Sequence, residues 1–258
     1  MSAVLQFTLT ANAGFLLQLG GYRFLVDALH RESGYPFSPV PQELLDEMSR
    51  PDSPFHDADF VLFSHDHPDH YTPDVVVEYL RHNRVRRLLL PAEQYGDRTA
   101  GLMAFLATDH RSYWKLGLPR GKRHLYRLEE DVFLLAAGIR HVSEPFRKLN
   151  CDALLLSVHG ENVLVLSDCD YMCLEDFAFL QGVPVRAAVV NPLLFHAEEG
   201  RQLLHAIDPE HVLIYHIPFE GEDTLSMRSL VRQDLRKHAG EYPDVQALMQ
   251  CRQTITLL

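Results

Sequence analysis

The sequence has few cysteines and no long hydrophobic segment, and both absences exclude classes of protein. Its cysteines are Cys151, Cys169, Cys173 and Cys251, too few for a disulfide scaffold and in keeping with a reduced, cytoplasmic location. No apolar run reaches the length of a transmembrane helix. The stretch from residue 1 to 21 contains no basic residue before its apolar part and is interrupted by polar residues, unlike a signal peptide. We therefore expect no membrane association.

Positive charge is also scarce. Lys and Arg number 24 against 35 Asp and Glu, which gives a net charge of -11. The one notable basic run, Arg81, Arg84, Arg86 and Arg87, falls between an expected helix and an expected strand, where a solvated turn is favoured over a groove for phosphates. An acidic surface repels nucleic acid. The expected partner is a small-molecule substrate, and nucleic acid is disfavoured.

Linkers, tandem repeats and low-complexity segments are absent as well. Apolar residues make up 47% of the chain and charged residues 23%, as in ordinary globular domains. The composition predicts a single domain over residues 1–258. The chain also lacks the GxSxG elbow of serine hydrolases, so a nucleophile must come from elsewhere.

Against these absences stands one dense motif, His65-Asp66-His67-Pro68-Asp69-His70. It places four metal-binding side chains in six residues directly after an apolar strand-like run, 60–63. Imidazole and carboxylate without thiolate suit an open catalytic metal site. A histidine-rich polar loop is the alternative, since the chain has 15 histidines, but the interleaved pattern favours metal.

The pattern of apolar runs and turn signals predicts two β-rich halves, each covered by helices. Such an order favours a layered αββα arrangement of the α/β class over an alternating parallel βαβ sheet. A long excursion over 28–59 and an aromatic loop with Tyr113 and Trp114 are expected to form walls of the site. Strands are expected at 4–9, 14–19, 22–26, 60–64, 87–90, 124–128, 132–139, 153–158, 163–166, 187–190 and 211–215, and helices at 42–48, 73–81 with Thr72 as N-cap, 100–107, 174–180, 198–206 and 224–238.

Three further residues follow apolar strands in the same way as His65 does. They are His141, Asp168 and His216, and side chains at the carboxyl ends of strands can converge. Each alone would be an ordinary surface or loop residue. Together with the loop they form a plausible ligand set, with His141 preferred to His159 because His159 precedes Gly160 in an expected hairpin turn.

These residues resemble the metallo-β-lactamase superfamily, whose HxHxDH motif is intact at 65–70. The segments around Asn12 and Asp27 resemble its first motif, and Ser167-Asp168 resembles its later Gly-Asp with Ser in place of Gly. The resemblance spans nearly the whole chain. It points to the four-layer αββα fold and to the simple one-domain metal-dependent hydrolases that include the ascorbate-phosphate lactonase-like group.

The resemblance implies a dinuclear site. One ion would be held by His65, His67 and His141, the other by Asp69, His70 and His216, with Asp168 bridging. The implied cofactors are two divalent metal ions, with zinc favoured over manganese or iron. A hydroxide bridging the metals would attack a small, anionic ester, lactone or phosphodiester, because metal lowers the pKa of water from about 16 to about 7.

Other residues are predicted around this centre. Asp69 is a catalytic candidate that orients or shuttles a proton. His196 is a candidate donor to substrate or leaving group, with capping of the following helix as an equal alternative. Asn12 and Tyr171 are candidate substrate contacts, although packing is the stronger interpretation for Tyr171. Asp27 would support the metal loop, and Asp66 either does the same or is a solvated surface residue.

Two other functions remain open from the sequence. An iron-dependent redox enzyme could use the same ligands, but the related flavodiiron proteins replace the second motif histidine, here His67, and carry a flavin domain. A non-catalytic metal-binding protein is the other alternative. Nuclease relatives need a large insert or an RNA-binding arm, which this chain lacks.

Overall fold

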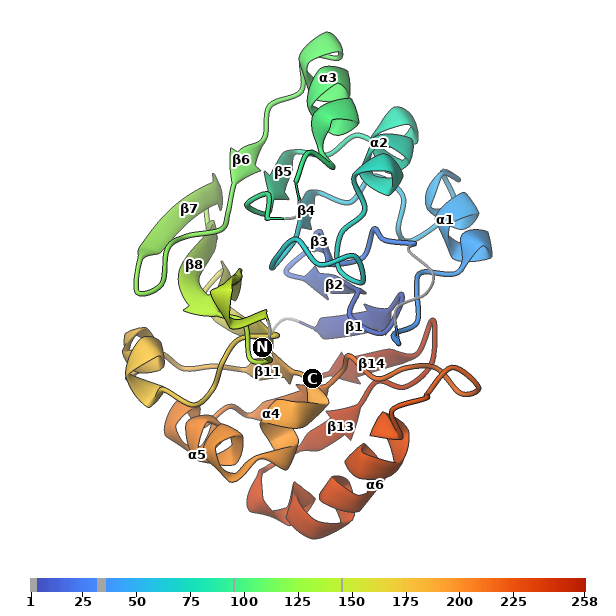
Figure 1. Cartoon of the computed structure of the whole chain (residues 1–258). Helices are drawn as coiled ribbons and strands as arrows, with labels where there is room; N and C mark the ends of the chain where they lie inside the picture. Colours follow the sequence, from blue (N-terminus) through green and yellow to red (C-terminus); the bar gives the residue numbers. More distant parts are fainter. Residues whose placement is uncertain (1–3, 32–35, 95, 145) are drawn as a thin grey trace. The chain divides into compact units, whose positions relative to one another are not determined.

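A computed structural model describes residues 4–31, 36–94, 96–144 and 146–258 (Figure 1). The chain separates into two compact units. The first unit is Met1–Leu116 with Gln250–Leu258, and the second unit is Gly117–Met249. The prediction of one domain over 1–258 stays a prediction. Residues 32–35 of the predicted wall segment lie outside the described residues.

The first unit contains a seven-stranded mixed sheet in the order β14-β1-β2-β3-β4-β5-β6. Its first three strands form the expected antiparallel meander, and β3 to β6 then run parallel to one another. Alternating burial along β1 fits a strand with one face in a core. The strands are β1 (Leu5–Leu9), β2 (Phe15–Leu19), β3 (Tyr22–Val26), β4 (Phe60–Leu62), β5 (Arg87–Leu90), β6 (Trp114–Lys115) and β14 (Thr254–Leu257).

Three helices belong to this unit: α1 (Gln42–Met48), α2 (Pro73–His82) and α3 (Ala100–Thr108). In α2 the buried residues recur at helical spacing, and Pro73 and Asp74 occupy its first turn as expected. Thr72 is the N-cap residue as predicted, although its side chain makes no capping hydrogen bond. Its hydroxyl instead accepts the backbone N–H of Arg31 at 3.3 Å, which ties the start of α2 to the chain after β3.

The second unit contains another seven-stranded mixed sheet, in the order β13-β12-β11-β10-β9-β8-β7. Strands β7 to β10 are antiparallel neighbours, whereas β10 to β13 run parallel. Strand β11 is buried throughout, as expected of a central parallel strand. The strands are β7 (Arg123–Glu129), β8 (Val132–Arg140), β9 (Asn150–Val158), β10 (Glu161–Ser167), β11 (Ala187–Val190), β12 (His211–Ile214) and β13 (Val245–Ala247).

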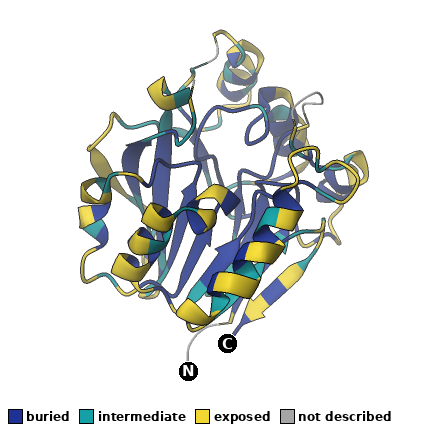
Figure 2. Cartoon of the chain, turned by 60° about the horizontal axis from the view of Figure 1, so that its bottom comes forward, coloured by how far each residue is buried: buried dark blue, intermediate teal, exposed yellow. Residues whose placement is uncertain are grey.

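The second unit's helices begin with the short α4 (Pro192–His196), followed by α5 (Glu198–Ile207) and α6 (Met227–His238). Gly200 allows α5 to lie against α4, since a Cβ there would come within 1.9 Å of the Leu194 carbonyl oxygen. Figure 2 shows the strands mostly buried and the helices exposed on one side. The 3-10 helices are η1 (Phe146–Lys148), η2 (Leu174–Leu180) and η3 (Ala239–Glu241).

The predicted fold class is confirmed: two mixed sheets are present, and each β-rich half carries helices. Some details differ from expectation. Trp114 lies in strand β6 rather than in a loop, and residues 174–180 form a 3-10 helix. Strands β13 and β14 and helix α4 were not expected from the sequence. Among the described residues, no helix combines the length and apolar character needed to cross a membrane.

Candidate metal centre

The histidine motif begins three residues beyond the end of β4, at the carboxyl edge of the first unit's sheet. Because β3 and β4 are parallel, the residues that follow them, Asp27 and Phe63, emerge at the same edge. The motif then turns back on itself, with the backbone N–H groups of His70 and Tyr71 both donating to the His67 carbonyl. The exposed fraction of each ligand candidate in the loop is at most 3%. This turn gathers the loop's donors in a buried position just before α2 begins.

Asp27 fixes the orientation of two motif histidines through one buried carboxylate. Its Oδ1 accepts the backbone N–H of Ser64 at 2.7 Å. Its Oδ2 lies 2.7 Å from Ser64 Oγ and 3.0 Å from His70 Nδ1. Since an ionised carboxylate only accepts, both neighbours donate to it. His70 therefore carries its hydrogen on Nδ1 and presents a lone pair at Nε2.

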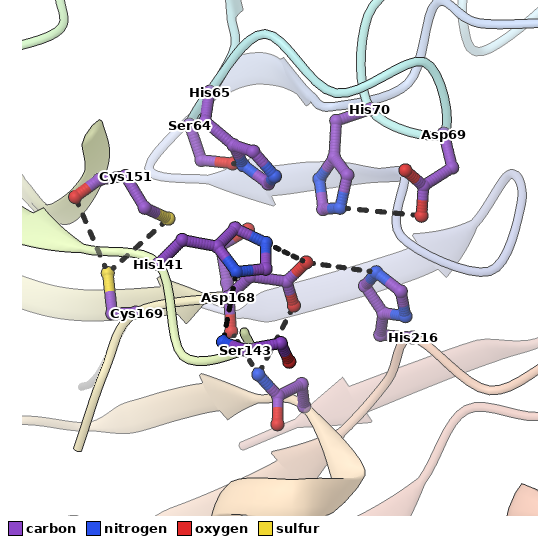
Figure 3. Close-up of polar contacts among 12 residues, drawn as sticks. Ser64, His65, Asp69, His70, His141, Ser143, Cys151, Asp168, Cys169 and His216 are labelled. Atoms are coloured by element: carbon purple, nitrogen blue, oxygen red, sulfur yellow. Dashed lines mark hydrogen bonds and ion pairs between the residues drawn. The ribbon is translucent and has the colours of Figure 1, made fainter. Parts of the chain in front are cut away.

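Ser64 fixes the position of the hydrogen on His65 in the same way (Figure 3). The single hydroxyl hydrogen of Ser64 goes to Asp27, so Ser64 Oγ accepts from His65 Nδ1, 2.9 Å away. His65 Nε2 is consequently the nitrogen with the lone pair. Such outer hydrogen bonds are what orient metal-binding histidines. The sequence analysis missed Ser64, although a hydroxyl residue directly before the first motif histidine was a usable signal.

Asp66 is not a solvated surface residue. It is 1% exposed, accepts the Gln94 backbone N–H at 2.8 Å and lies 3.7 Å from the Arg98 guanidinium. Arg98 also donates to the Tyr71 carbonyl at 3.1 Å. These contacts fix the loop between β4 and α2, which supports the interpretation of Asp66 as a supporting residue.

Asn12 is buried beside the loop. In one orientation its amide nitrogen lies 3.5 Å from Asp69 Oδ2. Turned by 180°, the amide donates to the Ser38 carbonyl and accepts the Ala13 N–H at 3.2 Å, so both of its ends are hydrogen-bonded. The second orientation is physically the better one. Asn12 thus holds the backbone next to Asp69, and its predicted contact with substrate stays a prediction.

In the second unit, His141, Asp168 and His216 all follow strand ends at one edge of the sheet. Strands β8, β10 and β12 run in the same direction, since β8 and β10 are each antiparallel to β9 and β10 to β12 are parallel. Their carboxyl ends therefore share an edge, the usual position of sites in such sheets. The backbone N–H of Val142 donates to the Asp168 carbonyl at 2.8 Å and ties two of these ends together.

Asp168 is central among the second unit's three candidates (Figure 3). Its Oδ2 lies 3.4 Å from His141 Nε2 and 3.5 Å from His216 Nε2. All three residues are at most 8% exposed. One carboxylate oxygen facing two imidazoles is the arrangement expected of a ligand shared between two neighbouring positions.

His141 differs from His65 and His70 in how its ring is held. Its Nδ1 accepts the backbone N–H of Ser143 at 3.2 Å, so in the neutral ring the hydrogen is on Nε2 and faces Asp168. A cation bound at Nε2 would replace that hydrogen. His159, the rejected alternative, lies in the turn between β9 and β10 with a half-exposed side chain 4.0 Å from Asp131.

The remaining predicted residues have structural partners. His196 closes α4, and its Nδ1 is 3.0 Å from Oδ2 of the buried Asp234, while about half of the imidazole is exposed. Tyr171 packs into the second unit's apolar core, and burial raises the pKa of its hydroxyl. Packing is therefore the role that the structure displays for Tyr171. A role in catalysis or substrate binding stays a prediction for both residues.

Two buried thiols lie near Asp168. Cys169 follows it in the chain, and Cys151 lies in the neighbouring strand β9. Cys151 and Cys169 are 0% exposed and their sulfur atoms are 3.6 Å apart. Burial raises the pKa of both thiols, and protonated thiols are poor nucleophiles and poor metal ligands. These two thiols are therefore poorer metal-ligand candidates than the nearby imidazole and carboxylate groups.

The donor set of each unit suits divalent metal ions. The first unit offers three imidazoles and one carboxylate, and the second offers two imidazoles and one carboxylate, all buried. These donors match zinc, manganese and iron, and the Asp27 network already presents lone pairs at two Nε2 atoms. The assignment of these seven side chains as ligands stays a prediction.

Comparison with solved structures shows the fold of metal-dependent hydrolases. The chain is similar to Igni18, a metallo hydrolase from the archaeon Ignicoccus hospitalis, with 12% identity and a TM-score of 0.63 over 99% of both chains. It is also similar to the isothiocyanate hydrolase from Delia radicum gut bacteria, with 15% identity and a TM-score of 0.63 over 97% of this chain and 98% of that one.

A third similar structure has a different chemistry. CmlA, a diiron β-hydroxylase from Streptomyces venezuelae, is 16% identical with a TM-score of 0.57, and the match covers 99% of this chain and 54% of CmlA. This chain thus spans about half the length of CmlA. No protein-family model and no curated protein matches the sequence. At these identities the likeness establishes the fold, and the chemistry has to be argued from the residues.

Proposed function

We propose that this chain is a metal-dependent hydrolase in which donors from both units hold two divalent ions. One ion would take His65, His67 and His141, and the other Asp69, His70 and His216, with Asp168 shared. The supporting geometry for the shared role is that Asp168 Oδ2 faces both second-unit imidazoles, at 3.4 and 3.5 Å. Neither unit alone offers six or seven donors, so the proposal requires both.

The observation that carries the proposal is the Asp27–Ser64 network. A buried carboxylate and a hydroxyl that set two imidazoles with their Nε2 lone pairs outward have little purpose in a purely structural histidine cluster. They are the outer hydrogen bonds that a metal site needs. A solvated polar loop would not be buried to this degree.

Two bound divalent ions would supply a water nucleophile near neutral pH and polarise the oxygen of the scissile group. The chain's own residues would hold and orient the reactants. Asp69, at the edge of the loop with Oδ2 3.8 Å from His70 Nε2, would orient the water and accept a proton. His196 donates Nδ1–H to Asp234, so it would need a second hydrogen, on Nε2, to act as a donor to the leaving group.

The substrate we propose is a small anionic ester, lactone or phosphodiester. Four positive charges of two ions exceed the two negative charges of Asp69 and Asp168, so an anion is favoured at the centre. The chain's net charge of -11 disfavours nucleic acid. The resemblance to the lactonase-like group and the fold shared with named hydrolases support hydrolysis.

The test is metal analysis combined with a substrate panel. We expect two ions per chain after loading with Zn²⁺, hydrolysis of at least one ester, lactone or phosphodiester, and loss of that activity in Asp168→Ala. Asp131→Ala, which removes an exposed carboxylate in the turn between β7 and β8, is the control. Full activity of a metal-free preparation would refute the proposal.

Analysis of the metal that is present after purification distinguishes hydrolase from oxygenase chemistry. The fold likeness to a diiron hydroxylase makes iron a concrete alternative. Protein purified without added metal should contain zinc or manganese if the proposal is right. Stoichiometric iron, together with oxygen consumption and no hydrolysis across the panel, would reverse the order of the two functions.

A further inference from the structure

Asn191 occupies the position next to Asp168 in the second unit's sheet. Strand β11 pairs in parallel with β10, with Val190 opposite Ser167, so the residue after β11 lies beside the residue after β10. Asn191 is 2% exposed, and its amide nitrogen lies 3.2 Å from Asp168 Oδ1. No expectation from the sequence concerned Asn191, although Asn followed by Pro after an apolar strand is a helix-start signal.

The orientation of this amide is fixed by its partners. Its oxygen accepts the backbone N–H of Leu194 at 2.9 Å, which makes Asn191 the N-cap of α4. A backbone N–H can only donate, so the amide oxygen must face Leu194 and the NH₂ group must face Asp168. The second N–H donates to the Ser167 carbonyl at 2.7 Å. All polar atoms of Asn191 are engaged in one arrangement.

These contacts give the two carboxylate oxygens of Asp168 different partners. Oδ1 accepts from Asn191, whereas Oδ2 faces His141 and His216. Asn191 also restrains Ser167, which has a left-handed φ of 45° where the resembling motif has glycine. Left-handed backbone is unfavourable for residues with a side chain. A hydrogen bond to the Ser167 carbonyl holds this conformation and with it the direction of Asp168.

We propose that Asn191 is a positioning residue for the Asp168 carboxylate: it binds Oδ1 and leaves Oδ2 as the atom presented to metal. The inference rests on the proposed function, since it concerns a ligand of that metal site. A cap-only role for Asn191 is the competing explanation. The two roles use different atoms of the same amide, because the oxygen caps α4 and the nitrogen contacts Asp168.

Two substitutions distinguish the role of the amide oxygen from that of the amide nitrogen. Asn191→Ser keeps an oxygen at the N-cap and loses the amide donor, whereas Asn191→Ala loses both. Asn162→Ser is the matched control, because Asn162, at the opposite end of β10, also donates its amide to a backbone carbonyl, that of Pro184 in the loop before β11. The measurements are Zn²⁺ affinity by competition with a chromophoric chelator and the thermal midpoint of the metal-free protein.

We expect Asn191→Ser and Asn191→Ala to weaken Zn²⁺ binding by a similar factor, about 10- to 100-fold at one or both sites. Both variants should lower the metal-free midpoint, because both lose the donor to the Ser167 carbonyl, and Asn191→Ala should lower it further because it also loses the cap of α4. The proposal is overturned if Asn191→Ser binds Zn²⁺ as the wild type does, or if the loss of affinity follows the loss of thermal stability across the two variants. Absence of Zn²⁺ binding in the wild type would instead refute the proposed function.

Discussion

The two units provide metal-ligand candidates in contrasting ways. The first unit places His65, His67, Asp69 and His70 in one short buried loop, while the second unit collects His141, Asp168 and His216 from three strand ends separated by long stretches of chain. The geometry of donors in a contiguous loop depends on one turn and on the residues that contact it. A dispersed set depends on the register of a whole sheet, so its geometry is only as good as the packing of that sheet.

The protonation of the ligands differs as well. In the first unit the Asp27–Ser64 network places hydrogens on Nδ1 of His65 and His70 and leaves Nε2 ready to bind. In the second unit Ser143 donates to His141 Nδ1, so His141 must lose a hydrogen from Nε2 on binding a cation. Under the proposed function, the loop would be organised before metal binds, and the second set would complete its organisation on binding.

Replacing Asp27 should break the organised loop and have the largest effect. Asp27→Asn keeps the volume, but an amide cannot accept from the backbone and hydroxyl of Ser64 and from His70 at once. We expect Zn²⁺ affinity to fall about 10- to 100-fold and the free energy of unfolding by about 1–3 kcal/mol. Chelator competition and urea unfolding measure both. Asp59→Asn, which also removes an acceptor of a backbone N–H, from Arg23, should leave metal binding unchanged.

Gly14→Ala tests how closely the backbone supports Asp27. A Cβ at this position would come within 2.5 Å of the Asp27 carbonyl oxygen and 2.7 Å of the Ala28 Cα. Since backbone atoms cannot move aside cheaply, we expect a loss of about 2–3 kcal/mol of stability, typical of overpacking. Gly101→Ala in α3, with open space around it, should instead gain about 0.5–1 kcal/mol. Equal stability of the two variants in urea would contradict the close approach.

Asp152 gives the second unit its own pH dependence. Burial raises the pKa of this carboxyl from 3.8 to about 6, although the N–H groups of Gly117 and Leu118 oppose the shift. Between these two values the folded protein binds more protons than the unfolded one, so stability falls as pH rises through the window and then levels off. Asp152→Asn should flatten this slope, by an amount on the order of 1–3 kcal/mol. Urea unfolding at pH 4 to 7 measures the difference, and parallel curves would refute it.

Ser167→Gly is the mildest change and probes the strained strand end in the second unit. Relief of the left-handed φ of 45° opposes the greater freedom of glycine in the unfolded chain, so we expect a net gain below about 1 kcal/mol. Ser157→Gly, in the interior of β9, should lose about 0.5–1 kcal/mol. Thermal unfolding of the pair measures the sign. A loss at Ser167 as large as that at Ser157 would argue against strain.

The contrast between the units also explains what the sequence revealed. The boundaries of β3, β5, α1 and β11 were predicted to the residue. The three strands are apolar runs that end before Asp, Pro or Asn, and α1 begins directly after Pro41. The loop at 65–70 was visible because its donors are neighbours in the chain. Strands β13 and β14 escaped notice because they have only three and four residues, too few for a periodic signal to stand out.

The sequence could not reveal which residues far apart in the chain come together at the site. His141, Asp168 and His216 could be proposed from strand ends, but their common edge follows from the direction of β8, β10 and β12. Asn191 and Ser64 each act through a few specific hydrogen bonds, and the sequence signals beside them do not predict which residues they bond to. Their roles became apparent only when the structure showed which atom donates and which atom accepts in each hydrogen bond.

Strand β14 has a consequence for the order of folding during synthesis. It pairs with β1 so that Thr8 and Thr254, which are 246 positions apart, share a hydrogen bond of 3.0 Å between their hydroxyls. A ribosome makes β1 early and β14 after the whole of the second unit. Until then one edge of β1 is open to other strands, the usual route to mispairing. The second unit's sheet can form before the first unit's sheet gains its last strand, so a nascent chain stalled before Gln250 should be the aggregation-prone species.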